Sequence, residues 1–154
     1  MICYFLTGQK YLHIYEPLNG RSSGPYTFTI NTLLKENFRH TIRLNNVNPN
    51  GHYFYCFGFS DHVLDEQNGY LGQETGQGTW STGLNKYICE NGENKGQKEQ
   101  KFGQNDTITL IGNNGVISFM INDRENDYSY NMNTTNLYIG FTVYYVGDQF
   151  EIIC

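Results

Sequence analysis

Cysteine and histidine are the side chains that most often carry nucleophilic or metal chemistry, and this chain has four of each. The cysteines are Cys3, Cys56, Cys89 and Cys154, and no two of them form a C-x-x-C pair. A structural zinc site needs such pairs, or histidines at ligand spacing, and the sequence contains neither. We therefore expect no metal ion and no other cofactor, and cysteines that stay reduced.

The histidines do not complete a catalytic pattern. A nucleophile relay needs Ser or Cys, His and an acid that converge in space, and no G-x-S-x-G or similar signature occurs. His62 lies in the acidic segment Asp61–Glu66, which could attract a cation, but the segment lacks the ligand spacing of a calcium loop. We interpret it as a solvated loop, and we assign His13 and His40 to the surfaces or edges of strands.

Paired carboxylates are the remaining catalytic pattern to consider. Glu74 and Glu90 would support glycoside hydrolysis only if they faced each other across a cleft. Sandwich folds that host this chemistry place closely spaced acids on one strand face, and no strand-like segment here alternates acid with acid. We therefore predict that the chain is not an enzyme.

The scaffold that would hold any site is a single domain rich in strand-forming residues. The chain has 154 residues, with 38% hydrophobic, 16% aromatic and 16% charged residues, and it contains no alanine. A chain without the best helix former, but rich in Tyr, Phe, Ile and Thr, favours strands over helices. The formal net charge is −5 and the Lys and Arg residues are scattered, so nucleic acid is not an expected partner.

Hydropathy gives no reason to expect a membrane partner or export. No apolar run approaches the ~20 residues that span a bilayer. The apolar start, Met1–Leu6, has no basic n-region and stops at Thr7-Gly8, so we interpret it as a strand and not as a signal peptide. The expected compartment is the cytoplasm or the nucleus.

Period-two alternation of apolar and polar residues predicts most of the strands. Tyr26–Ile30 and His40–Leu44 alternate in this way, as half-buried strands do. Tyr53–Phe59 is apolar on both faces, which is typical of a central strand between two covering layers. Asn91–Lys101 has no apolar residue and is predicted to be an exposed loop, and Asn31–Phe38 is at most a single helical turn.

Two hairpins are predicted from pairs of such segments. Thr107–Ile111 and Val116–Ile121 flank a short Gly-Asn-Asn-Gly turn whose residues tolerate positive φ. Leu137–Tyr144 and Gln149–Ile153 flank a Val-Gly-Asp turn in the same manner.

These elements indicate an all-β fold, an antiparallel β-sandwich formed by residues 21–154. Residues 1–20 precede it as a strand or hairpin extension, which either extends one sheet or pairs with another chain at its edge. No repeat and no linker divides the chain further.

Several short sequence blocks follow one another in a distinctive order from about Ser22 onward. They are Ser22–Ile30, Phe57–Ser60, Gly69–Gly72 with Thr79–Ser81, Phe102–Ile108, Gly115–Asn122, and Leu137–Tyr138 with Val146–Ile152. In this order they resemble the SPRY domain, a bent β-sandwich that serves as a protein-interaction module. The chain departs from the family pattern at Asn105-Asp106 and Asn122-Asp123, turn positions where Asn or Asp can replace the family's glycine.

The resemblance also implies where a partner binds. In SPRY relatives a peptide pocket is built from a tyrosine-leucine-glycine loop and a late tryptophan-glycine loop, where this chain has Val146-Gly147. Aromatic side chains anchor interfaces at low cost in rotamer entropy, and glycine lets a partner backbone approach. The resemblance implies Tyr70, Leu71, Gly72, Val146 and Gly147 as partner-binding residues, and we add the neighbouring aromatic residue Tyr145. Trp80 matches a largely buried family position, and we expect it in the core.

The resulting hypothesis is a non-enzymatic SPRY-like adaptor or scaffold that binds a peptide segment of a partner protein through loops at one end of the sandwich. Two alternatives stay open. The chain could be a structural subunit of a larger protein assembly, because a bare domain of this kind does no chemistry alone. It could also be a lectin-like carbohydrate-binding sandwich, since abundant Asn, Tyr and Gly suit sugar stacking and hydrogen bonding.

Overall fold

The structure, a computed structural model, describes residues 11–13, 23–30, 34, 36–47, 55–64, 67–73, 75–83, 87–97, 103–131, 136–145 and 148–153. In chain order the strands are β1 (Tyr11–His13), β2 (Ser23–Thr29), β3 (Phe38–Asn46), β4 (Cys56–Ser60), β5 (Gln67–Asn68), β6 (Thr79–Gly83), β7 (Tyr87–Glu90), β8 (Glu93–Gln97), β9 (Thr107–Asn113), β10 (Val116–Ile121), β11 (Arg124–Asn131), β12 (Tyr138–Tyr145) and β13 (Gln149–Ile153). These ranges contain no helix long and apolar enough to cross a membrane. The predicted helical turn at Asn31–Phe38 lies partly outside them, and its last residue begins β3.

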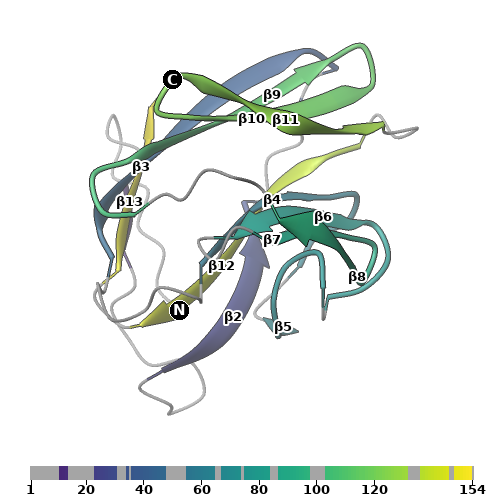
Figure 1. The fold of residues 1–154 in the computed structure, drawn as a ribbon. Coiled ribbons are helices and arrows are strands. Elements are labelled where there is room, and N and C mark those ends of the chain that lie inside the picture. The colour runs from purple at the N-terminus through teal and green to yellow at the C-terminus, as the bar shows by residue number, and fades with distance from the viewer. Residues whose placement is uncertain are drawn as a thin grey trace.

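The strands form two antiparallel sheets that pack as two layers (Figure 1). Among the described residues, the six-stranded sheet has the order β1-β13-β3-β9-β10-β11, and the seven-stranded sheet has the order β5-β2-β12-β4-β6-β7-β8. Neighbouring strands run antiparallel in both sheets. This confirms the all-β antiparallel sandwich predicted from the alternating segments.

Aromatic side chains fill the space between the two sheets. Phe57, Phe59 and Phe141 of the seven-stranded sheet are fully buried, and so are Phe119 and Phe150 of the six-stranded sheet. The ring centroids of Phe57 and Phe150 lie 5.6 Å apart, and those of Phe59 and Phe119 lie 5.9 Å apart, within the range where aromatic pairs attract each other. Burial of each such side chain contributes roughly 1.5–3 kcal/mol, so these rings are a main source of stability.

Strand β4 is the central strand that its sequence predicts. All of its residues are buried, and it pairs with β12 on one side and with β6 on the other. Trp80 of β6 is 7% exposed, which confirms the prediction that it lies in the core. Its indole N–H donates to Glu90 Oε1 at 3.1 Å, so the one polar group of this side chain has a partner.

The predicted hairpin of β9 and β10 is confirmed. The two strands pair residue by residue, and the loop between them is reduced to Asn114 and Gly115. Both residues have positive φ, 49° and 78°, as a two-residue type I′ turn requires. Asn122 and Asp123, which join β10 to β11, follow the same rule with φ values of 50° and 62°, and Asn105 has φ 68°. Asn and Asp thus occupy turn positions whose backbone favours glycine, as the departures from the SPRY pattern predicted.

The second predicted hairpin is wrong. Strand β12 lies in the seven-stranded sheet between β2 and β4, whereas β13 lies in the six-stranded sheet between β1 and β3. The chain therefore crosses from one sheet to the other between Tyr145 and Gln149. The physical reason is that β12 is buried from Ile139 to Val143 and has a neighbour at both of its edges already. A short turn signal in the sequence does not distinguish a connection within one sheet from a crossing between two.

For Asn91–Lys101 the sequence predicted an exposed loop. The prediction of a loop is wrong for Glu93–Gln97, and the prediction of exposure is confirmed for Glu93 to Lys95. Glu93–Gln97 forms β8, which pairs with β7 at the edge of the seven-stranded sheet. Asn91 and Gly92 make the turn before it, with φ values of 52° and 89°. The side chains from Glu93 to Lys95 are exposed. An edge strand of this kind needs no apolar face, and therefore no hydrophobic pattern marks it in the sequence.

The part of the N-terminal extension that the structure describes is β1, at the edge of the six-stranded sheet. It pairs with β13, with Tyr11 opposite Glu151. The segment therefore extends a sheet of its own chain, which is one of the two arrangements considered for it. The division of the chain at residue 20 stays a prediction.

The strain at the β10–β11 turn can be tested with two adjacent substitutions. Asp123→Gly is expected to raise the free energy of unfolding by about 0.5–1 kcal/mol, because glycine adopts positive φ without the strain that aspartate carries. Asn122→Gly is the matched control and should lower it by about 1–2 kcal/mol. Glycine there removes the bonds of the Asn122 side chain with Thr107 N–H (2.9 Å) and Asp106 Oδ1 (2.8 Å). Urea unfolding measures both, and effects of the same sign would contradict the strain argument.

Candidate functional site

The loop that carries Tyr70 lies on the outer face of the seven-stranded sheet, the face that points away from the core. Alternation along β12 puts Thr142 on this outer face and Phe141 in the core. The loop consists of Gly69–Gly72, directly after β5, and we call it the Tyr70 loop.

Three buried hydroxyl groups attach the Tyr70 loop to the sheet. Thr142 Oγ1 accepts the Leu71 N–H at 2.8 Å, and Ser81 Oγ donates to the Leu71 carbonyl oxygen at 2.5 Å. Thr27 Oγ1 donates to the Gly69 carbonyl oxygen at 2.6 Å and lies 2.7 Å from Thr142 Oγ1. Because the Thr27 proton is directed to Gly69, Thr142 donates its own proton to Thr27. The hydroxyl groups thus satisfy backbone groups that are buried away from water.

Leu71 is fully buried against the sheet. It lies over Gly140, where a Cβ atom would come within 2.8 Å of Leu71 Cδ2. Leu71 also forms a small apolar cluster with Cys56 and Leu64, and Tyr70 packs against this cluster. Leu71 therefore attaches the loop to the sheet. The Leu71 side chain is not at the surface, and the assignment of this residue to the partner surface stays a prediction.

Gly72 ends the Tyr70 loop in a buried position with φ +81°. A Cβ atom here would lie 2.8 Å from Ser81 Oγ and 3.0 Å from the Cys89 carbonyl oxygen. Glycine is therefore needed for the close approach of the loop to its own sheet, and the assignment of Gly72 to the partner surface stays a prediction.

Tyr70 is the residue of the predicted Tyr-Leu-Gly set that keeps exposed surface, and it is half-buried. Its carbonyl oxygen accepts the N–H groups of Gln73 at 3.2 Å and Thr75 at 3.3 Å. The backbone is thus held on both sides of Tyr70, before it by the bonds of Gly69 with Thr27 and β2, and after it by these turn bonds and the attachment of Leu71. The loop presents an aromatic side chain from a fixed backbone.

The Tyr70 loop begins at the end of the sheet where β12 finishes. The Gly69 N–H donates to the Pro25 carbonyl oxygen at 3.1 Å, and Tyr145 pairs with Ser23. Pro25 and Ser23 both lie at the start of β2, which runs beside the end of β12 in Figure 1. Of Tyr145 the structure describes the backbone, and Val146-Gly147 lies outside the described residues. Their assignment to the partner surface stays a prediction.

Asp148 is a buried residue at this end that the sequence patterns did not single out as part of a site. It is 2% exposed, and the hydroxyl of Tyr55 donates to its Oδ1 atom at 2.8 Å. Tyr55 directly precedes β4, and Asp148 directly precedes β13, so the bond joins the two sheets at the crossing. No local signal in the sequence links an aspartate in a turn motif to a tyrosine 93 positions earlier.

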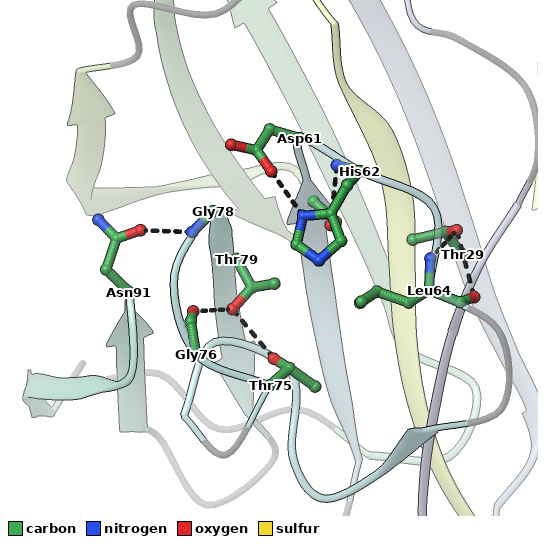
Figure 2. Close-up of polar contacts among 10 residues, drawn as sticks. Thr29, Asp61, His62, Leu64, Thr75, Gly76, Gly78, Thr79 and Asn91 are labelled. Atoms are coloured by element: carbon green, nitrogen blue, oxygen red, sulfur yellow. Dashed lines mark hydrogen bonds and ion pairs between the residues drawn. The ribbon is translucent and has the colours of Figure 1, made fainter.

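The opposite end of the seven-stranded sheet carries the acidic segment with His62 (Figure 2). His62 Nδ1 lies 2.6 Å from Asp61 Oδ1, and both side chains are exposed, as the solvated-loop interpretation predicted. The Asp61 carboxylate occupies the space next to Gly78, where a Cβ atom would come within 2.2 Å of Asp61 Oδ1. The Gly78 N–H donates to Asn91 Oδ1 at 2.9 Å, which fixes the neighbouring turn. The polar groups of Asp61 and Asn91 thus fix the positions of the loops at this end of the sheet.

The described residues also place several of the side chains considered for metal, carboxylate or thiol chemistry. Those residues include no group of three or more His, Cys, Asp or Glu side chains that could hold a metal ion. Glu74 lies outside the described residues, and Glu90 accepts the indole N–H of Trp80. Cys56 and Cys89 are buried and form no disulfide. Burial raises the pKa of the Cys89 thiol, which keeps it protonated and weakly nucleophilic.

Comparison with solved structures identifies the architecture. The SPRY domain of human HERC1 matches 97% of this chain with 91% of its own, at a TM-score of 0.71 and 19% sequence identity. The match with a human SPRY domain covers 92% of this chain and 95% of that domain, at a TM-score of 0.70 and 12% sequence identity. The match with the TRIM65 PSpry domain covers 94% of this chain and 81% of that domain, at a TM-score of 0.65 and 10% sequence identity. The chain has the SPRY fold.

The SPRY fold confirms the resemblance to SPRY domains that was predicted from the order of the sequence blocks. No protein-family sequence profile matches the chain, and no curated protein matches it. At identities between 10% and 19% the likeness establishes the arrangement of strands and not a shared partner.

The attachment of the Tyr70 loop predicts the effect of Thr142→Val. Valine keeps the shape of threonine but cannot accept the Leu71 N–H or donate to Thr27. The free energy of unfolding should fall by about 1–3 kcal/mol, and the Leu71 amide should exchange with deuterium faster. Thr109→Val is the matched control, because buried Thr109 bonds the hydroxyl of Thr41 at 2.9 Å in the other sheet. Unchanged Leu71 exchange in T142V, or equal acceleration in T109V, would show that this hydroxyl does not hold the loop.

The bond at the sheet crossing predicts a loss of stability in Tyr55→Phe. The substitution removes a donor from a buried carboxylate and should lower the free energy of unfolding by about 1–3 kcal/mol. Tyr138→Phe removes a hydroxyl from a partly exposed tyrosine and should change it by no more than about 0.5 kcal/mol. Denaturant unfolding compares the two variants, and similar small losses in both would argue against a structural role for the Tyr55–Asp148 bond.

Proposed function

We propose that this chain is a non-enzymatic interaction module that binds a short peptide segment of a partner protein in the cytoplasm or the nucleus. The binding surface is formed by Tyr70 together with the segment Tyr145–Gly147 that follows the main part of β12. No cofactor takes part. The resemblance to SPRY domains supports the general role, and the geometry around Tyr70 supports this surface over others.

The observation that carries the proposal is the half-buried Tyr70 side chain on a loop that is fixed to the sheet. A partner that binds a flexible loop must order it, whereas here the ordering has occurred on folding. Tyrosine adds a large contact area with few rotatable bonds and a hydroxyl that can meet a polar group. These properties suit the recognition of a peptide by a small number of anchors.

The chemistry of the same region favours binding over catalysis. Besides the half-buried Thr75, whose hydroxyl accepts the Gly72 N–H at 3.0 Å, the hydroxyl groups that contact the Tyr70 loop belong to Thr27, Ser81 and Thr142, and these three are buried. Their protons are engaged with the backbone of the loop or with one another. They serve as structural supports, since a nucleophile would need an accessible oxygen and a base beside it.

Peptides selected from a random display library against the wild-type protein supply the ligand for a direct test. Tyr70→Ala is expected to weaken binding of the selected peptides by about 10–100-fold, the effect of losing one tyrosine anchor. Tyr138→Ala is the matched control, because Tyr138 is also partly exposed but lies at the other end of β12. It should change affinity by no more than about twofold.

A second variant tests the other half of the surface. Gly147→Asp should weaken the same peptides, and urea unfolding of each variant establishes that it is folded. If the selected peptides bind Y70A and G147D as tightly as the wild type, the proposed surface is wrong. If Y138A loses as much affinity as Y70A, the peptides bind at the opposite end of the sandwich.

A further inference from the structure

The Asn-Gly pairs of the described residues differ in their hydrogen bonds, and this difference affects how readily each asparagine can lose its amide group. Asparagine followed by glycine deamidates when the glycine nitrogen reaches the side-chain carbonyl carbon, because glycine has no Cβ atom to obstruct the approach. The described residues contain the pairs Asn68-Gly69, Asn91-Gly92 and Asn114-Gly115. Whether each pair reacts depends on the freedom of the glycine nitrogen and of the asparagine carboxamide.

Two of the pairs are held in hydrogen bonds that oppose the reaction. The Gly69 N–H donates to a carbonyl oxygen at the start of β2 at 3.1 Å, and the Gly92 N–H donates to the Gly72 carbonyl oxygen at 2.9 Å. At the second pair the carboxamide is also fixed, since Asn91 Oδ1 accepts the Gly78 N–H at 2.9 Å. Attack at either position requires that these bonds open first.

The third pair forms the exposed tip of the β9–β10 hairpin. Asn114 and Gly115 are both exposed and constitute the whole of the two-residue turn. The Asn114 backbone N–H donates to Asn37 Oδ1 at 3.1 Å. Within the part of the chain that the structure describes, neither the Asn114 carboxamide nor the Gly115 N–H has a hydrogen-bond partner. In the described part of the chain both reacting groups are therefore free of the hydrogen bonds that hold the other two pairs.

We propose that Asn114 is a site of spontaneous deamidation, and that the fold protects Asn91 from the same reaction. The Gly115 nitrogen forms a bond to Asn114 Cγ, the Cγ–Nδ2 bond breaks, and ammonia leaves with the proton that the Gly115 nitrogen gives up. Water then opens the resulting succinimide ring at one of its two carbonyl carbons. The products are aspartate or isoaspartate, and the net reaction converts asparagine and water into the acid and ammonia.

The modification would change both the charge and the turn. It adds one negative charge to a chain whose formal net charge is already −5. The isoaspartate product also inserts a methylene group into the main chain of a two-residue turn whose φ values match the twist of its strands. The pairing of β9 with β10 next to the turn would then weaken, which links a slow chemical change to the stability of the six-stranded sheet.

Peptide mapping by mass spectrometry tests the proposal on the full-length protein. The folded chain is kept at body temperature and mildly alkaline pH, and the acid forms of each peptide are quantified over time. Asn114 is expected to deamidate at least on the order of tenfold faster than Asn91, as expected when roughly one hydrogen bond must open at the protected site. Asn114→Asp is the control, because aspartate tolerates the positive φ of this turn position, has no carboxamide to lose and leaves Asn113 without a following glycine.

The same measurement in denaturant separates the fold from the local sequence. Both asparagines precede glycine, so the ratio of the two rates should fall toward one when the chain is unfolded. Equal rates in the folded protein would overturn the proposal. A ratio that persists unchanged in denaturant would also overturn it, since the fold would then not be the cause.

Discussion

A backbone segment that is buried on top of a β-sheet must find hydrogen-bond partners, and side chains have to supply many of them because most backbone groups of the sheet are already paired. This constraint decides where the Tyr70 loop can lie. The outer face of the seven-stranded sheet meets it with the hydroxyl groups of Thr142, Thr27 and Ser81, which contact the N–H and carbonyl groups of the loop. Gly140 leaves the space that the Leu71 side chain fills. The loop is therefore attached through its backbone and through one apolar side chain.

The attachment of the loop depends on the core through the register of β12. Phe141 stacks on Phe28 at 5.6 Å and meets Phe57 edge-on at 5.7 Å. Because successive side chains in a strand point to opposite faces, these contacts force Thr142 to the outer face. A slip of β12 by one residue would bury the hydroxyl among the aromatic rings and expose the phenylalanine. The aromatic core thus determines the polar pattern that holds the site.

Features that depend on neighbouring residues were predictable from the sequence. A segment that is apolar on both faces identified β4, and alternation identified the strands of the β9–β10 hairpin. Asn105 and Asp123, which have positive φ, occur at turns where the family pattern has glycine. The resemblance of the ordered blocks anticipated the fold, since it used their order along the whole chain rather than any one motif.

Features that depend on distant residues were not predictable in this way. The burial of Leu71 requires Thr142, 71 positions away, and the crossing from β12 to β13 is joined by Tyr55 and Asp148, 93 positions apart. No periodicity within a segment records such a pairing. Strand β8 was missed for the opposite reason, because its exposed edge needs only backbone bonds to β7 and leaves no pattern in its side chains.

The way the Tyr70 loop is attached also determines which of its residues can change. Leu71 and Gly72 are fixed by the sheet beneath them, so a substitution at either position disturbs the fold. The attachments of the loop at Gly69 and Leu71 use backbone atoms, and they do not depend on the identity of the Tyr70 side chain. Its exposed surface can therefore vary while the loop keeps its shape. Such a division between a fixed backbone and a variable side chain lets a shared architecture persist at identities of 10% to 19% while each chain presents its own surface.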